Sequence, residues 1–145
     1  MYKFVASVAL ALVAALGLGS VAHAQAAKPV KVVYHVNTDV DTILPILNNI
    51  RNHLSADPTV KIVVVTHGKG INFLLQDAKD SKGHEFSGMV SDLASQGVEF
   101  RVCNNTLTAN KISPDRLLME TKIVPSGVAE VARLQFQEGY AYLKP

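Results

Sequence analysis

The chain of 145 residues contains a single cysteine, Cys103, and this scarcity limits the chemistry that it can perform. Without a second cysteine, the chain can form neither an intramolecular disulfide nor a Cys-x-x-Cys redox pair. Cys103 is therefore a buried inert residue, half of a bridge between two chains, a metal ligand or a reactive thiol. The polar residues that follow it favour a metal ligand or a reactive thiol.

Other features are missing as well, and each absence removes a class of function. The sequence has no internal repeat, no low-complexity segment and no basic stripe, so we expect no nucleic-acid partner. Without Lys3, which lies in the export signal predicted below, 13 basic residues stand against 12 acidic ones. The sequence also lacks a Walker phosphate loop and the Gly-x-Ser-x-Gly elbow, so we do not expect a P-loop nucleotide-binding protein or a serine hydrolase of that type.

The N-terminal residues 1–24 have the pattern of a secretory signal peptide. Lys3 precedes an apolar run that extends from Phe4 to about Leu18, and Ala22-His23-Ala24 follows as a cleavage site. A retained membrane anchor is the alternative, but the run is shorter than the about 20 residues that a spanning helix needs. We therefore expect a mature domain of residues 25–145 that is periplasmic or secreted and has no membrane contact after cleavage.

The mature chain alternates between segments of strand and helix character. Apolar β-branched runs predict strands, and apolar residues at helical spacing predict helices, with Asp41 as the N-cap of the first one. This alternation indicates a single three-layer α/β domain with a mainly parallel central sheet flanked by helices. The predicted strands are 30–36, 60–66, 98–103, 123–124 and 140–143, and the predicted helices are 41–54, 71–76, 86–96, 106–111 and 126–137.

Three chemically versatile side chains are predicted to lie at the carboxyl ends of the first three strands. His35 lies near the end of the first strand, His67 follows the second and Cys103 ends the third. In open parallel sheets, ligands bind at the carboxyl ends of the strands, where loops and helix N-termini converge. The three residues are therefore expected at one edge of the sheet, although the sequence does not give the strand order.

Cys103 is the strongest candidate for a functional residue. A helix is predicted soon after it, and the positive end of a helix dipole lowers the pKa of a nearby thiol. Arg101 lies on the same face of the strand and is expected to add to this effect, while Asn104, Asn105 and Thr106 provide polar groups around the sulfur. The alternative is that Cys103 is a small buried hydrophobic residue.

The two histidines have functional and structural interpretations. His67 is followed by Gly68 and Gly70, which allow the backbone to approach a ligand closely. His67 could equally be a turn residue, and His35 could pack beside Tyr34. The remaining mature histidines, His53 and His84, are expected to be in contact with solvent.

Four segments of residues 30–145 resemble the DsrE/DsrF-like family. This resemblance implies a small α/β fold with a central parallel sheet and assembly into a homo-oligomer, a trimer or a hexamer. It also implies that Cys103 matches a cysteine that, in the sulfur-transfer members, carries a persulfide from one protein to another. The segments are Val64–Gly70, Gly97–Leu107, Val124–Glu130 and Leu134–Tyr142.

Three functional hypotheses follow. The first is an exported sulfur carrier or sulfurtransferase without a cofactor, in which Cys103 bears the persulfide, Arg101 lowers its pKa and His67 moves protons. Its partners would be sulfur donor and acceptor proteins or small thiols, which contact Asn104, Asn105, Thr106, Gly68 and Gly70. The second is a copper or zinc protein with Cys103, His67 and His35 as ligands. The third is a non-catalytic oligomeric binding module in which Cys103 is buried.

Overall fold

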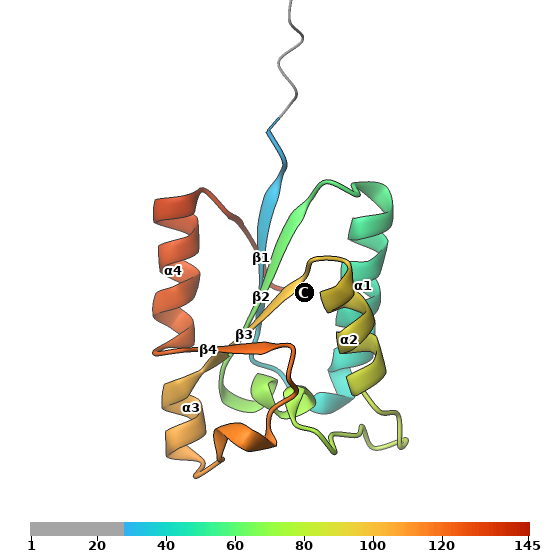
Figure 1. Cartoon of the computed structure of the whole chain (residues 1–145), viewed down its shortest axis with the longest axis vertical. Helices are drawn as coiled ribbons and strands as arrows, with labels where there is room; N and C mark the ends of the chain where they lie inside the picture. The colour runs from blue at the N-terminus through green and yellow to red at the C-terminus, as the bar shows by residue number, and fades with distance from the viewer. Residues whose placement is uncertain (1–27) are drawn as a thin grey trace, which may run out of the picture.

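The computed structural model describes residues 28–145, which form a five-stranded sheet with helices on both faces (Figure 1). All of the strands are parallel, in the order β4-β3-β2-β1-β5. The predicted α/β class and parallel sheet are confirmed. The predicted signal peptide lies outside the described residues. The strands are β1 (Lys31–Val36), β2 (Lys61–Thr66), β3 (Glu99–Cys103), β4 (Thr121–Val124) and β5 (Ala141–Leu143).

The helices are distributed over the two faces and the carboxyl end of the sheet (Figure 1). α1 (Ile43–Ala56) and α2 (Ser87–Ser95) cover one face, and α4 (Gly127–Glu138) covers the other. α3 (Asn104–Ala109) lies beyond the carboxyl end of β3, together with the 3-10 helices η2 (Gly68–Leu74) and η3 (Pro114–Arg116). A third 3-10 helix, η1 (Val40–Thr42), leads directly into α1.

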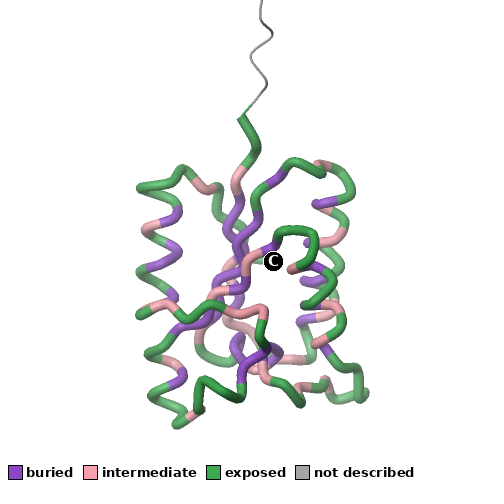
Figure 2. The backbone as a smooth tube through the Cα atoms, in the orientation of Figure 1, coloured by how far each residue is buried: buried purple, intermediate pink, exposed green. Residues whose placement is uncertain are grey.

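Because both faces of the sheet are covered, the core is divided into two apolar clusters. Figure 2 shows the central strands as largely buried. In β2, Ile62 and Val64 belong to the cluster under α1 and α2, whereas Val63 and Val65 belong to the cluster under α4. Burial on both sides explains why this strand is a nearly continuous apolar run. The larger cluster also holds the edge-to-face rings of Phe73, Phe86 and Phe100.

The start of α1 differs from the prediction. Asp41 is not the N-cap, because its Oδ1 accepts a hydrogen bond from the backbone N–H of Ser81 at 2.7 Å. Asp39 instead caps η1 by accepting from the backbone N–H of Val40 at 2.9 Å. The chain therefore begins its helical turn earlier than expected, which leaves Asp41 free to anchor the loop between η2 and α2.

Gly70 is the glycine most tightly enclosed by backbone. A β-carbon at this position would lie 2.2 Å from the carbonyl oxygen of Val36, because η2 packs directly on the end of β1. We expect Gly70→Ala to lower the free energy of unfolding by at least about 1–3 kcal/mol, the usual cost of overpacking. Urea denaturation would measure this change.

A matched control for this substitution is Gly88→Ala in α2, where an added β-carbon meets nothing within 4 Å. Alanine in a helix is favoured over glycine by about 0.5–1 kcal/mol, so this variant should be as stable as the parent or more so. Equal stability of Gly70→Ala and the parent would contradict the packing described here.

Candidate functional site

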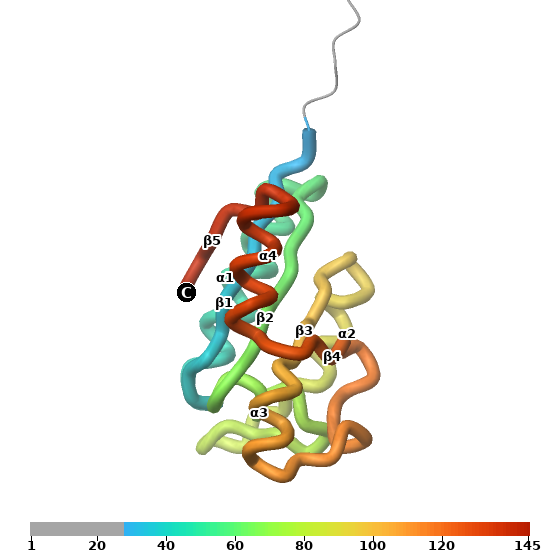
Figure 3. The backbone as a smooth tube through the Cα atoms, turned by 90° about the vertical axis from the view of Figure 1, so that its left-hand side faces the viewer, coloured from blue at the N-terminus to red at the C-terminus, as the bar shows by residue number. Residues whose placement is uncertain are grey.

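Cys103 ends β3 and occupies the N-cap position of α3, and it is only 4% exposed. Although it is buried, it belongs to neither of the two apolar clusters. It lies instead where the starts of α3 and α4 meet the carboxyl end of the sheet, and Figure 3 shows α4 beginning beside β4 and β3. Backbone N–H groups and a hydroxyl face the thiol there.

These donors control the ionisation of the thiol. Burial alone would raise the pKa of Cys103, but hydrogen bonds from the backbone N–H of Gly127, from the Thr106 hydroxyl and from the backbone N–H groups of Thr106 and Asn105 stabilise the thiolate. The pKa of Cys103 is consequently lower than the ordinary value for a thiol. A lowered pKa increases the thiolate fraction, and the thiolate is the nucleophilic form of cysteine.

Thr106 links the Cys103 site to the loop after β2. Its Oγ1 accepts a hydrogen bond from the backbone N–H of Gly68 at 3.1 Å, so its own proton is available to the sulfur. Gly68 adopts a φ of +52°, a left-handed conformation that suits glycine. The structure thus places Asn105 and Thr106 at Cys103, whereas Gly68 is linked to the site through Thr106.

The other two predicted contact residues, Asn104 and Gly70, are not among the groups that bond to the Cys103 sulfur. The side chain of Asn104 is exposed and makes no hydrogen bond within residues 28–145. Gly70 is close to the backbone of Val36 rather than to Cys103, so the close approach that it allows is between two parts of the protein's own chain.

Arg101 has partners that the sequence did not reveal. Its guanidinium forms ion pairs with Glu130 and with Glu99, the latter at 2.9 Å. It is not among the groups that shift the pKa of Cys103. The charge of Arg101 is therefore used to hold α4 against β3 and not, as expected, to attract the thiolate directly.

Glu130 connects the two arginines of this network and is 9% exposed. Hydrogen bonds from Arg133, and also from Arg101, hold the pKa of its carboxyl below the ordinary value despite burial. We expect Glu130→Gln to lower the free energy of unfolding at neutral pH by about 1–3 kcal/mol, the range for hydrogen bonds to charged groups. Urea denaturation would measure the change.

The pH dependence of stability gives a second test of the same network. Because the folded-state pKa of Glu130 is depressed, its stabilising effect is complete above the ordinary glutamate pKa of 4.5 and is lost as the pH falls through the folded value. The difference between the parent and Glu130→Gln should therefore shrink below pH 4.5. Glu138→Gln, at the exposed end of the network, should lower the free energy of unfolding by less than Glu130→Gln does. An equal decrease would contradict the central role of Glu130.

His67 lies next to Cys103, and Gly127 is the residue that fits between them. A β-carbon on Gly127 would lie 3.1 Å from the Cβ of His67 and 3.2 Å from the Cβ of Cys103. The absence of a side chain at Gly127 thus lets α4 start close to both. Sequence reasoning missed this residue, although its position directly after the Ser126 cap marks it as the start of a helix.

His35 reaches the same edge from β1. Its Nε2 lies 2.6 Å from the Nε2 of His67, and its Nδ1 lies 2.8 Å from the hydroxyl of Tyr142 in β5. Tyr34 points to the opposite face of β1 and bonds to His53 at 2.9 Å, so His53 is half-buried rather than solvated. His84 is exposed, as predicted, and pairs with Asp80.

The three predicted strand-end residues thus form a row along one edge of the sheet. Within residues 28–145, no three His, Cys, Asp or Glu side chains are grouped in a way that would hold a metal ion. Copper or zinc binding stays a prediction. No helix in the same range is long and apolar enough to cross a membrane.

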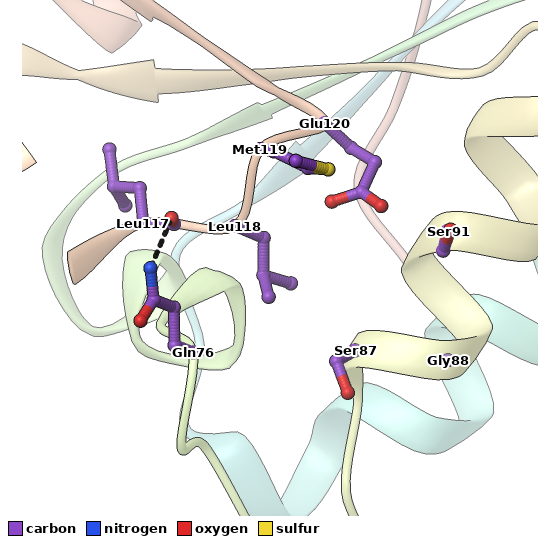
Figure 4. Close-up of a pocket in the computed structure, with 8 residues that line it drawn as sticks. All are labelled: Gln76, Ser87, Gly88, Ser91, Leu117, Leu118, Met119 and Glu120. Atoms are coloured by element: carbon purple, nitrogen blue, oxygen red, sulfur yellow. Dashed lines mark hydrogen bonds between the residues drawn. The ribbon is translucent and has the colours of Figure 1, made fainter. Parts of the chain in front are cut away.

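A separate surface groove of about 430 Å³ lies between α2 and the segment before β4 (Figure 4). The amide of Gln76 closes one side of it by donating to the carbonyl of Leu117. None of the site residues predicted from the sequence lines this groove. Its wall instead consists of Gln76, Ser87, Gly88, Ser91, Leu117, Leu118, Met119 and Glu120.

The sequence profile of the DsrE/DsrF-like family matches residues 31–145, which is almost all of the described chain. The chain belongs to the DsrE/DsrF-like family. The resemblance seen in its sequence is therefore confirmed, and the DsrE/DsrF-like match includes all of β1 to β5 and Cys103. No curated protein matches the chain in sequence.

Solved structures agree with this DsrE/DsrF-like assignment. The chain is 38% identical to MTH1491 from Methanobacterium thermoautotrophicum, described as a protein of unknown function, with a TM-score of 0.71 over 80% of this chain and 99% of that one. The YchN protein from E. coli has a TM-score of 0.62 over 81% of this chain and 97% of that one. Its identity of 14% indicates a shared fold alone.

Proposed function

We propose that this protein is an exported sulfur carrier that holds sulfane sulfur as a persulfide on Cys103. The observation that carries the proposal is the convergence of N–H groups from the starts of α3 and α4 on the Cys103 sulfur. Hydrogen bonds to the charged form of a group favour that form. Such donors stabilise the thiolate that attacks a sulfur donor, and they also stabilise the thiolate that leaves when the sulfur is passed on.

The proposed transfer is a pair of thiol exchange reactions. In loading, the Cys103 thiolate attacks the outer sulfur of a persulfide R–S–SH; the new S–S bond forms, the donor S–S bond breaks, and R–S⁻ leaves. In discharge, an acceptor thiolate attacks the outer sulfur on Cys103, takes it as a persulfide and releases the Cys103 thiolate. The sulfane sulfur keeps its oxidation state throughout, so the transfer needs no metal or organic cofactor.

The low exposure of Cys103 limits its partners. With only 4% of the residue exposed, the thiol is reached by small polysulfides and thiols or by a cysteine on a slender segment of a partner protein. We expect these sulfur donors and acceptors outside the cytoplasm, because the signal peptide predicted at residues 1–24 would direct export.

We further propose that the protein assembles as a homo-oligomer, a trimer or a hexamer. Phe136 on α4 is 97% exposed and Met119 before β4 is 93% exposed. Ile123 in β4 and Val128 at the start of α4 add further exposed apolar surface. Large apolar side chains that are exposed in one copy of the chain are candidates for such an interface.

The proposed function is tested by the intact mass of the mature protein after brief exposure to inorganic polysulfide. We expect added sulfur, which a small thiol such as 2-mercaptoethanol should remove. Prior alkylation of Cys103 should prevent the addition. If reduced, unmodified protein gains no sulfur, the proposed function is wrong.

A further inference from the structure

A hydrogen-bonded row of side chains runs along the carboxyl edge of the sheet from β5 to the Cys103 site. We propose that Tyr142, His35 and His67 form a proton relay that serves sulfur transfer at Cys103. This inference rests on the proposed function and assigns roles to Tyr142 and His35 that the sulfur-carrier hypothesis does not use.

The geometry of the row is continuous. The Tyr142 hydroxyl lies 2.8 Å from Nδ1 of His35, and Nε2 of His35 lies 2.6 Å from Nε2 of His67. The two imidazole rings stack with centroids 4.7 Å apart. The row follows the sheet order, because β5, β1 and β2 are neighbours and His67 directly follows β2.

Each of these contacts is a hydrogen bond with one shared proton, so all of the hydrogen bonds in the row can point in either of two directions. When two imidazole nitrogens face each other, one carries a proton and the other accepts it. In one state, Tyr142 donates to His35, which donates to His67. In the other state, His67 donates to His35, which donates to the Tyr142 oxygen, and the hydroxyl proton of Tyr142 points to water. A proton that enters at one end therefore releases a proton at the other end.

One end of the row is open to proton exchange with water, and the other end lies beside the Cys103 site. Tyr142 is 41% exposed, so its hydroxyl can exchange protons with water. At the inner end, Nδ1 of His67 has no hydrogen-bond partner within residues 28–145, and the Cβ atoms of His67 and Cys103 both border Gly127. This ring nitrogen is therefore free to exchange a proton with a donor or acceptor thiol that reacts at Cys103.

Burial, with smaller effects of nearby positive charge, favours the neutral form of both histidines. Burial, the neighbouring His67 and the nearby Lys144 lower the pKa of His35, and burial and Lys144 lower the pKa of His67. A neutral imidazole can accept a proton at one nitrogen and release one at the other, which an imidazolium cannot do.

The two halves of the sulfur cycle use the relay in opposite directions. In discharge, the acceptor thiol gives its proton to Nδ1 of His67 and becomes the attacking thiolate, while Tyr142 releases a proton to water. In loading, the departing R–S⁻ takes a proton from Nδ1 of His67, and Tyr142 recovers one from water. One loading and one discharge therefore return the row to its starting polarity, with no net proton gained or lost by the protein.

The test is the rate at which persulfide-loaded protein gives sulfur to two thiols slightly above neutral pH. 2-Mercaptoethanol is mostly protonated there and needs a base, whereas thiophenol is mostly ionised and does not. We expect Tyr142→Phe to slow transfer to 2-mercaptoethanol by about tenfold, a modest part of the usual effect of general acid–base catalysis, and to leave transfer to thiophenol unchanged. Tyr140→Phe is the matched control, because the Tyr140 side chain forms no hydrogen bond within the described range.

Each outcome decides the proposal. Slowing with 2-mercaptoethanol alone, in Tyr142→Phe but not in Tyr140→Phe, supports the relay. Equal slowing with both thiols would indicate that β5 had shifted and would overturn the relay, as would rates that match those of the parent. In these two cases the sulfur-carrier function would stand, because Cys103 had been loaded; if the parent takes up no sulfur, both proposals fall.

Discussion

Cys103→Ser is expected to abolish sulfur uptake from polysulfide completely while leaving the fold intact. Serine is close in size to cysteine, and its hydroxyl can accept the hydrogen bonds that Gly127 and Asn105 direct at this position. A hydroxyl at neutral pH is not a nucleophile toward sulfane sulfur, so no persulfide can form. Intact mass after exposure to polysulfide, beside circular dichroism of the same sample, measures both parts of the prediction.

This result separates chemistry at Cys103 from adventitious sulfur. Polysulfide that merely associates with the protein would add mass to Cys103→Ser and to the parent alike. Uptake that persists in the serine variant would show that Cys103 does not carry sulfur. It would instead favour the hypothesis of a non-catalytic binding module with a buried cysteine.

Gly127→Ala is expected to slow the reaction of Cys103 with iodoacetamide at neutral pH by about tenfold. An added β-carbon would lie 3.1–3.2 Å from the Cβ atoms of His67 and Cys103 and from the Thr66 carbonyl oxygen, so the start of α4 and its neighbours must separate by a few tenths of an ångström. The hydrogen bond from the Gly127 N–H to the thiolate then weakens. Hydrogen bonds to charged groups contribute about 1.5–3 kcal/mol, and about 1.4 kcal/mol corresponds to a tenfold change.

The pH dependence of the alkylation rate tests this prediction directly, because its midpoint follows the pKa of Cys103. Losing a donor to the thiolate raises the pKa of Cys103, so the midpoint of the profile should move to higher pH, and the two rates should converge where both thiols are fully ionised. Gly88→Ala, in the first turn of α2 with nothing within 4 Å of the new β-carbon, should leave the profile unchanged. A profile for Gly127→Ala that matched the parent's would contradict the role of this N–H.

Arg101 shows how a prediction from one strand fails when another element intervenes. Its position two residues before Cys103, on the same face, led us to expect that its charge would act on the thiol. The sequence could not show that Glu130, 29 residues away in α4, would occupy the guanidinium. Arg101 therefore influences Cys103 only by holding α4, whose first N–H group faces the sulfur.

The contacts of the two histidines also could not be predicted from the sequence, although their positions could. Each was placed correctly at the end of its strand, because hydrophobic patterns mark where strands end. Their contact across 32 residues, and the contact of His35 with Tyr142 across 107, depend on the order in which the strands align. Short strands such as β5 give too weak a pattern to reveal their neighbours.

The sequence by itself determined the parallel α/β class, most segment positions, the family and the candidate for the reactive residue, because these depend on local periodicity, turn residues and a single cysteine. Only the tertiary structure decided which groups face the Cys103 sulfur, that Gly127 fits between Cys103 and His67, and that Tyr142 joins the histidines. These contacts join residues that are distant in the chain. Strand order and the crossing of α4 from one edge of the sheet to the other bring them together, and no local pattern encodes that arrangement.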